Sequence, residues 1–211
     1  MNIELLELYE VTNMLLSCRP QKPVNAILMH ARSFDGDDDG LFELVRKLIP
    51  SVAPIVVING GGGEGMRGPS KKAWPGVEEY EKRLSSLGVM DIIRSAPARH
   101  TQEESEKFVD IIKERGWRRV VVANLPHYLL RSMLSGVCEI QKRGLSVLLY
   151  PVAPVSLSWR KPVFGSQGVS PIKRFAQCHE ELKRITEYQK QYPDKFVSIK
   201  SLVEYLSVLP G

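Results

Sequence analysis

Two short segments of the 211-residue sequence concentrate side chains that can bind a ligand or react. They are Ala98-Arg99-His100-Thr101-Gln102-Glu103-Glu104 and Asn124-Leu125-Pro126-His127-Tyr128-Leu129-Leu130-Arg131. Together they carry a hydroxyl, carboxylates, imidazoles, a phenol and a guanidinium. Carboxylates and imidazoles serve as general bases, and a guanidinium binds a carboxylate or phosphate through two parallel hydrogen bonds. The two segments therefore predict a ligand-binding site.

Each segment follows an apolar run typical of a strand and opens a helical pattern. The strands are expected at 90–93 and 119–123, and the helices at 101–115 and 126–143. Because parallel α/β sheets bind ligands at the carboxyl ends of their strands, both segments are expected at one such edge.

Within the first segment, Thr101 and Glu104 have the spacing of a capping box, in which both side chains bond to backbone amides at a helix start. This interpretation accounts for Glu104 and leaves Glu103 as the carboxylate for a ligand. In the second segment, His127 and Arg131 are four residues apart and share a helix face. With Asn124 they predict an anion clamp. The alternative is that Thr101 and the acids only start a helix, and that His127 is an ordinary surface or capping histidine.

A glycine-rich segment, 60–65, follows the β-branched run 54–58. Its spacing fits a dinucleotide-binding fingerprint, but Pro69 and Pro75 precede the next helical pattern, so the required direct turn into a helix is missing. The glycines still allow a ligand close to the backbone, with amides available to an anion. A flexible loop is an equally good interpretation. The candidate residues are Gly60, Gly61 and Gly62.

His30 and Arg32 follow the first expected strand, 24–29, and are further candidates for ligand binding. Asp35 and the acids 37–39 resemble a cation site, but carboxylates at a helix start are the commoner explanation. We therefore expect no metal. The three cysteines are widely spaced, and they predict neither a disulfide framework nor a zinc site.

The alternation of strands and helices predicts an α/β fold, a Rossmann-like three-layer arrangement with a parallel sheet of about five strands. The fifth strand is expected at 145–150. A long loop, 151–170, interrupts the pattern before helices at 172–191 and after Ser198. We expect an N-terminal helix in 1–20, an α/β domain in 21–155, and a loop with a helical C-terminal appendage in 156–211, packed on the same domain.

The composition is that of a soluble globular protein, with 43% hydrophobic and 25% charged residues. The net charge is +5, but the basic residues alternate with acids, so nucleic acid is not expected as a partner. No apolar run approaches the ~18 residues of a membrane helix, and the N-terminus does not resemble a signal peptide. We expect a cytoplasmic protein that does not contact membranes.

The order of these motifs resembles that of the ElyC/SanA/YdcF family of bacterial proteins. The resemblance covers about residues 24–155, and segment 181–189 is similar to the ending of one branch without a membrane anchor. The motifs are Ile58-Asn59-Gly60-Gly61, Leu84-Ser85-Ser86-Leu87-Gly88-Val89, Thr101-Gln102-Glu103-Glu104 and Arg131.

Three positions depart from the family pattern. Glu104 replaces an asparagine, His30-Ala31-Arg32 replaces glycines after the first strand, and Tyr128 stands where the family has the histidine of His-x-x-Arg. Either His127 or Tyr128 could take that histidine's role. The resemblance implies a groove over the strand ends and S-adenosylmethionine as a ligand, which is attributed to the YdcF branch.

Together, the residues and the resemblance favour a protein that binds a small anionic or nucleotide-like ligand at the carboxyl edge of the sheet. One alternative is a hydrolase or transferase that uses Glu103 or His127 as a general base. Another is an adaptor in envelope-related metabolism, which would contact a partner through the 151–170 loop and the basic tail of the chain.

Overall fold

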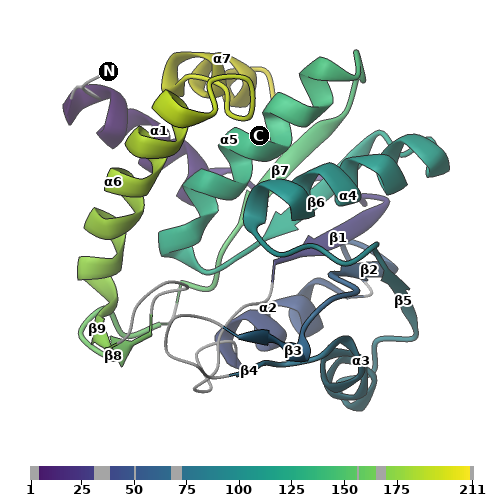
Figure 1. Ribbon diagram of the computed structural model, residues 1–211. Helices are drawn as coiled ribbons and strands as arrows, with labels where there is room; N and C mark the ends of the chain where they lie inside the picture. Colours follow the sequence, from purple (N-terminus) through teal and green to yellow (C-terminus); the bar gives the residue numbers. More distant parts are fainter. Residues whose placement is uncertain are drawn as a thin grey trace.

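A five-stranded parallel sheet forms the centre of the protein (Figure 1). The computed structural model describes residues 5–30, 39–49, 51–67, 73–155, 157–164 and 170–209. The strand order is β5-β2-β1-β6-β7, and every neighbouring pair is parallel. The strands are β1 Ala26–Met29, β2 Ile55–Ile58, β5 Asp91–Arg94, β6 Arg119–Ala123 and β7 Leu148–Val152. This confirms the predicted α/β fold.

Helices link the parallel strands because a parallel connection must cross over the sheet. Figure 1 shows α4 and α5 across one face, and α6 and α7 pack against α5. The chain builds the sheet from β1 toward β5 and then returns to add β6 and β7 on the other side of β1. The helices are α1 Leu5–Ser17, α2 Asp39–Leu48, α3 Val77–Ser86, α4 Thr101–Arg115, α5 Pro126–Lys142, α6 Arg174–Gln191 and α7 Ile199–Ser207.

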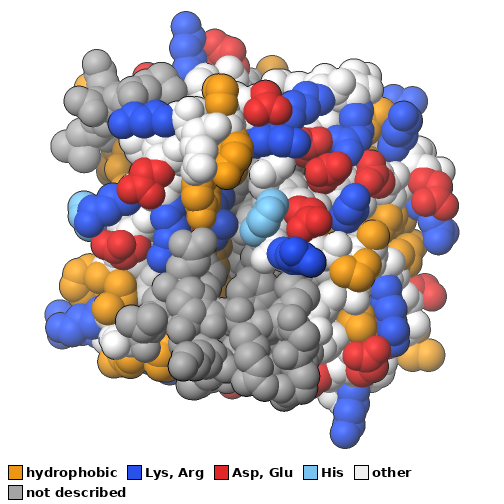
Figure 2. All heavy atoms as spheres, viewed as in Figure 1, with side chains coloured by type: hydrophobic (Ala, Val, Ile, Leu, Met, Phe, Trp, Pro, Cys, Tyr) orange, Lys and Arg blue, Asp and Glu red, His pale blue; other side chains and the backbone are white. Residues whose placement is uncertain are grey.

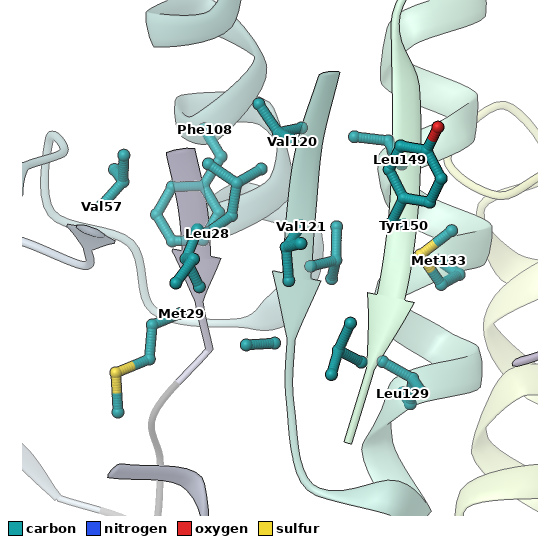
Figure 3. Close-up of a cluster of buried hydrophobic side chains, with 14 of the residues drawn as sticks. Leu28, Met29, Val57, Phe108, Val120, Val121, Leu129, Met133, Leu149 and Tyr150 are labelled. Atoms are coloured by element: carbon teal, nitrogen blue, oxygen red, sulfur yellow. The ribbon is translucent and has the colours of Figure 1, made fainter. Parts of the chain in front are cut away.

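Four of the strands, the inner β2, β1 and β6 and the edge strand β7, are buried along almost their whole length, which explains why they read as continuous apolar runs rather than alternating ones. Figure 3 shows part of the core, where Leu28, Val121 and Tyr150 from three adjacent strands meet side chains of the covering helices, such as Phe108. The edge strand β5 instead begins and ends on exposed charged residues, which discourages pairing with another chain.

Two small antiparallel pairs occur where the sequence predicts loops and, at 172–173, the first residues of a helix. β3 Gly63–Arg67 pairs with β4 Ala73–Trp74, and β8 Pro162–Val163 pairs with β9 Ile172–Lys173. The three two-residue strands are too short to show a periodicity, and β3 is rich in glycine, which is depleted in strands. The second pair lies at the start of α6, where the Arg174 amide donates to Lys161 O at 3.0 Å. The described part of the long loop is therefore held against this helix.

The fifth sheet strand starts three residues later than predicted. Gly144 has φ +61°, and the amide of Leu145 donates to Ile140 O at 3.1 Å, so these residues close the end of α5. The helix α6 starts at Arg174, two residues later than predicted, because Ile172 and Lys173 pair in β9. None of the described helices combines the length and apolar character needed to cross a membrane.

Candidate functional site

The start of α4 is capped one residue earlier than the sequence predicts. His100 is the N-cap, and its Nδ1 accepts the Glu103 amide at 3.2 Å. Glu103 reaches back in turn, and its Oε2 accepts the Arg99 amide at 2.8 Å. The predicted capping pair of Thr101 and Glu104 is therefore wrong. Thr101 and Glu104 are three residues apart, but so are His100 and Glu103, which form the cap in the structure. Thr101 is already the first residue of the helix.

Glu104 is buried and hydrogen-bonds to His30 instead. Its Oε2 lies 2.6 Å from His30 Nδ1, and the side chains are 0% and 2% exposed. The ring of Phe108 meets the His30 ring edge-on at 5.0 Å. A carboxylate that accepts from Nδ1 fixes the tautomer of the imidazole and leaves Nε2 to accept a proton. Sequence reasoning missed Glu104 because the capping pattern had already explained it.

The His30–Glu104 pair lies beside β1 and β6, where the order in which the strands were added to the sheet reverses. The His30 amide donates to Ala123 O at 3.0 Å, which places His30 at the carboxyl ends of β1 and β6. Open α/β sheets bind ligands at such switch points. The structure thus keeps the predicted candidate His30 at the carboxyl edge and adds Glu104 as its partner. Arg32, the other candidate after β1, lies outside the described residues, as do Asp35, Asp37 and Asp38.

The glycines after β2 are used for close backbone packing. A Cβ on Gly60 would lie 2.1 Å from Ser95 O, and the amide of Gly61 donates to Asn59 Oδ1 at 2.9 Å. Asn59 also binds both the amide and the carbonyl of Ala98. Gly62 has φ +111°, and a Cβ there would meet Pro75 O. These contacts hold the loops after β2 and β5 together.

Three predicted residues, Thr101, Glu103 and Arg131, do lie together, around a cavity of about 460 Å³ that we call the Arg131 cavity. It is formed by the first turn of α4, Arg131 of α5, and the end of α6 with the segment after it. Figure 2 shows acidic and basic side chains interspersed on this side of the molecule. The full lining is His100, Thr101, Gln102, Glu103, Glu106, Arg131, Tyr188, Tyr192, Lys195 and Phe196.

Arg131 is held in place by a buried ion pair. Its Nε donates to Glu181 Oε2 of α6 at 2.6 Å, and the two side chains are 7% and 2% exposed. The other oxygen of Glu181 binds Arg184. The guanidinium carbon of Arg131 also lies 5.6 Å from the centre of the Tyr128 ring, in cation–π contact. Tyr128 is buried beneath Arg131, and its aromatic ring is part of the packing.

His127 does not join Arg131 in a clamp, because the two side chains line different cavities. His127 lies in an apolar cavity between α1, α5 and α6, and the centres of the His127 and Tyr128 rings are 4.1 Å apart. Burial, with the positive charges of Arg174 and Arg131, lowers the pKa of His127 to about 3. The imidazole is therefore neutral. Both residues lie in α5 as predicted, but Arg131 pairs with Glu181 of the packed helix α6.

Asn124 uses its side-chain amide within the protein, in bonds to the start and the second turn of α5. Its Nδ2 donates to Ser132 Oγ at 2.7 Å, and its Oδ1 accepts the Leu125 amide at 2.7 Å. These bonds fix the start of α5 and use both ends of the amide. Across the described ranges, no three His, Cys, Asp or Glu side chains are grouped as ligands for a metal ion.

Comparison of the chain with protein-family models gives no match, and comparison with curated proteins gives no relative. The chemistry of the site therefore has to be inferred from its own residues.

Proposed function

We propose that the protein binds a small anionic or nucleotide-like ligand in the Arg131 cavity. The observation that supports this function is the combination of cations, aromatic rings and carboxylates around one hollow of about 460 Å³. Ligand pockets usually enclose about 300–1,000 Å³, with a few polar groups that orient the ligand.

Each part of such a ligand has a matching element of the lining. Arg131, Lys195 and the positive end of α4 attract a phosphate or carboxylate. Tyr188 and Tyr192 offer aromatic surface to a base. Glu103 and Glu106 line the same cavity and accept hydrogen bonds from hydroxyl groups of a ribose.

S-adenosylmethionine, which the family resemblance implies, contains a carboxylate, a ribose and a heteroaromatic base. It is therefore one ligand of the proposed class. The cytoplasmic location expected from the sequence belongs to the same proposal, since this class of ligand is found there.

Calorimetric titration with AMP, S-adenosylmethionine and uncharged adenosine tests this function. We expect AMP or S-adenosylmethionine to bind, and Lys195→Gln to weaken AMP about tenfold or more, since a hydrogen bond to a charged group contributes about 1.5–3 kcal/mol. Lys190→Gln is the matched control, because Lys190 is exposed at the end of α6 and does not line the cavity. Absence of binding by all three compounds, or an equal effect of both substitutions, would refute the proposal.

A hydrolase or transferase is the second candidate, and the His30–Glu104 pair favours it. Two bases were considered from the sequence. The low pKa of His127 makes it a weak base, and one carboxylate oxygen of Glu103 already accepts a hydrogen bond from the Arg99 amide. His30 instead has its Nδ1 on a buried carboxylate. This arrangement orients the general base in many enzymes that activate a hydroxyl or a water molecule.

A screen with nitrophenyl esters and nitrophenyl phosphates tests the second candidate. Turnover should be lost in both His30→Gln and Glu104→Gln and should persist in His179→Gln, which changes an exposed histidine of α6. Turnover that survives both site substitutions would exclude His30 as the base.

A further inference from the structure

The apolar cavity beside His127 is separate from the Arg131 cavity. Both cavities are lined by α5 and α6, but by different residues of these helices. It encloses about 190 Å³ and is lined by α1, the first turns of α5, Trp159 and the middle of α6. We call it the His127 cavity. The lining is Leu8, Thr12, Leu15, Leu16, Pro126, His127, Leu129, Leu130, Trp159, Cys178, Glu181, Leu182 and Ile185. The Arg131–Glu181 ion pair links the two cavities, since each side chain lines one of them.

The charged group in this lining is already neutralised. Glu181 uses one carboxylate oxygen for Arg131 and the other for Arg184. His127 is uncharged, because burial and the nearby guanidinium groups of Arg174 and Arg131 lower its pKa to about 3. A charged ligand would therefore lose its hydration without gaining a counter-ion, so the cavity favours a neutral one.

His127 is the polar group for which the structure provides no partner. The residue is 5% exposed, and neither ring nitrogen has a hydrogen-bond partner within the part of the chain that the structure describes. A neutral imidazole has one donor and one acceptor, and buried groups of this kind are normally paired. A ligand that carries one hydroxyl satisfies a nitrogen once the imidazole turns toward the cavity.

The volume sets the size of the ligand. An apolar cavity of about 150 Å³ lined by Leu, Ile and Phe stays dry and binds benzene. The His127 cavity is slightly larger and has a similar lining. We propose that it is a binding site for a neutral, single-ring aromatic molecule that bears one hydroxyl, with the ring among the leucines and the hydroxyl on His127. This site goes beyond the proposed function and does not depend on it.

Calorimetric titration of the full chain with phenol and with toluene tests the proposal. We expect saturable one-to-one binding of phenol with a Kd on the order of 1 mM or tighter. His127→Leu should weaken phenol about fivefold, the effect of one lost neutral hydrogen bond, and should leave toluene no weaker.

A variant at the cavity rim locates the bound ligand without disturbing the core. Leu16 lines the cavity and is 41% exposed, so Leu16→Trp should fill the entrance and abolish phenol binding. Leu6→Trp is the control, because Leu6 lies on the same helix, is 77% exposed and is not part of the lining. The proposal is overturned if phenol does not bind saturably, if Leu16→Trp leaves its affinity unchanged, or if His127→Leu weakens both compounds equally.

Discussion

Glu181→Gln should destabilise the protein more than Arg131→Gln, although the two substitutions break the same buried ion pair. The reason is that Glu181 has two partners. Its loss leaves the guanidinium groups of Arg131 and Arg184 close together without a counter-charge. Loss of Arg131 leaves Glu181 still paired with Arg184.

The magnitudes follow from burial. Arg131 and Glu181 are 7% and 2% exposed, and Arg184 is 15% exposed. Removing one partner of a buried pair costs about 3–5 kcal/mol, so we expect about 4 kcal/mol for Glu181→Gln. For Arg131→Gln the remaining pair with Arg184 reduces the loss to about 2 kcal/mol.

Equilibrium unfolding in urea measures both values. With an m-value of about 2.5 kcal/mol/M, the midpoint should fall by about 1.6 M for Glu181→Gln and by about 0.8 M for Arg131→Gln. Glu180→Gln is the control, because Glu180 is the preceding residue of α6 and its pair with Lys183 is exposed. An Arg131→Gln variant that is as unstable as Glu181→Gln would show that Arg184 does not compensate the carboxylate.

Two further predictions concern pH and the glycine-rich loop. The pKa of His127 falls from 6.5 in the unfolded chain to about 3 in the folded protein, so the unfolded state binds more protons between these values and stability decreases as pH falls from 6.5 toward 3. Between pH 7 and pH 5, urea unfolding should show a loss about 2 kcal/mol larger in the wild type than in His127→Leu, and parallel curves for the two proteins would contradict a neutral buried imidazole. Gly60→Ala should cost about 2–3 kcal/mol in thermal unfolding, because its Cβ would lie 2.1 Å from the backbone oxygen of Ser95. Gly144→Ala, at φ +61° but in open space, should cost about 1 kcal/mol, and equal losses would argue against the clash at Gly60.

The sequence by itself determined the five strands of the central sheet, their parallel direction and the helices between them. Runs such as Val120-Val121-Val122 are apolar on both faces, which requires helices on both sides of the sheet. Local signals also placed Thr101 and Glu103 at the start of α4, where they line a cavity with Arg131. These features could be predicted because periodicity and capping depend on neighbours within a few residues along the chain.

Only the tertiary structure decided which side chains meet. Glu104 fits a capping box by spacing, yet it is buried against His30, which is 74 residues away in the sequence. Arg131 is four residues from His127 in α5, yet its partner is Glu181, 50 residues away. Which distant residues pair depends on how α4 and α6 pack against the rest of the protein and on which residues of these helices become buried. The spacing of residues along the chain does not determine either.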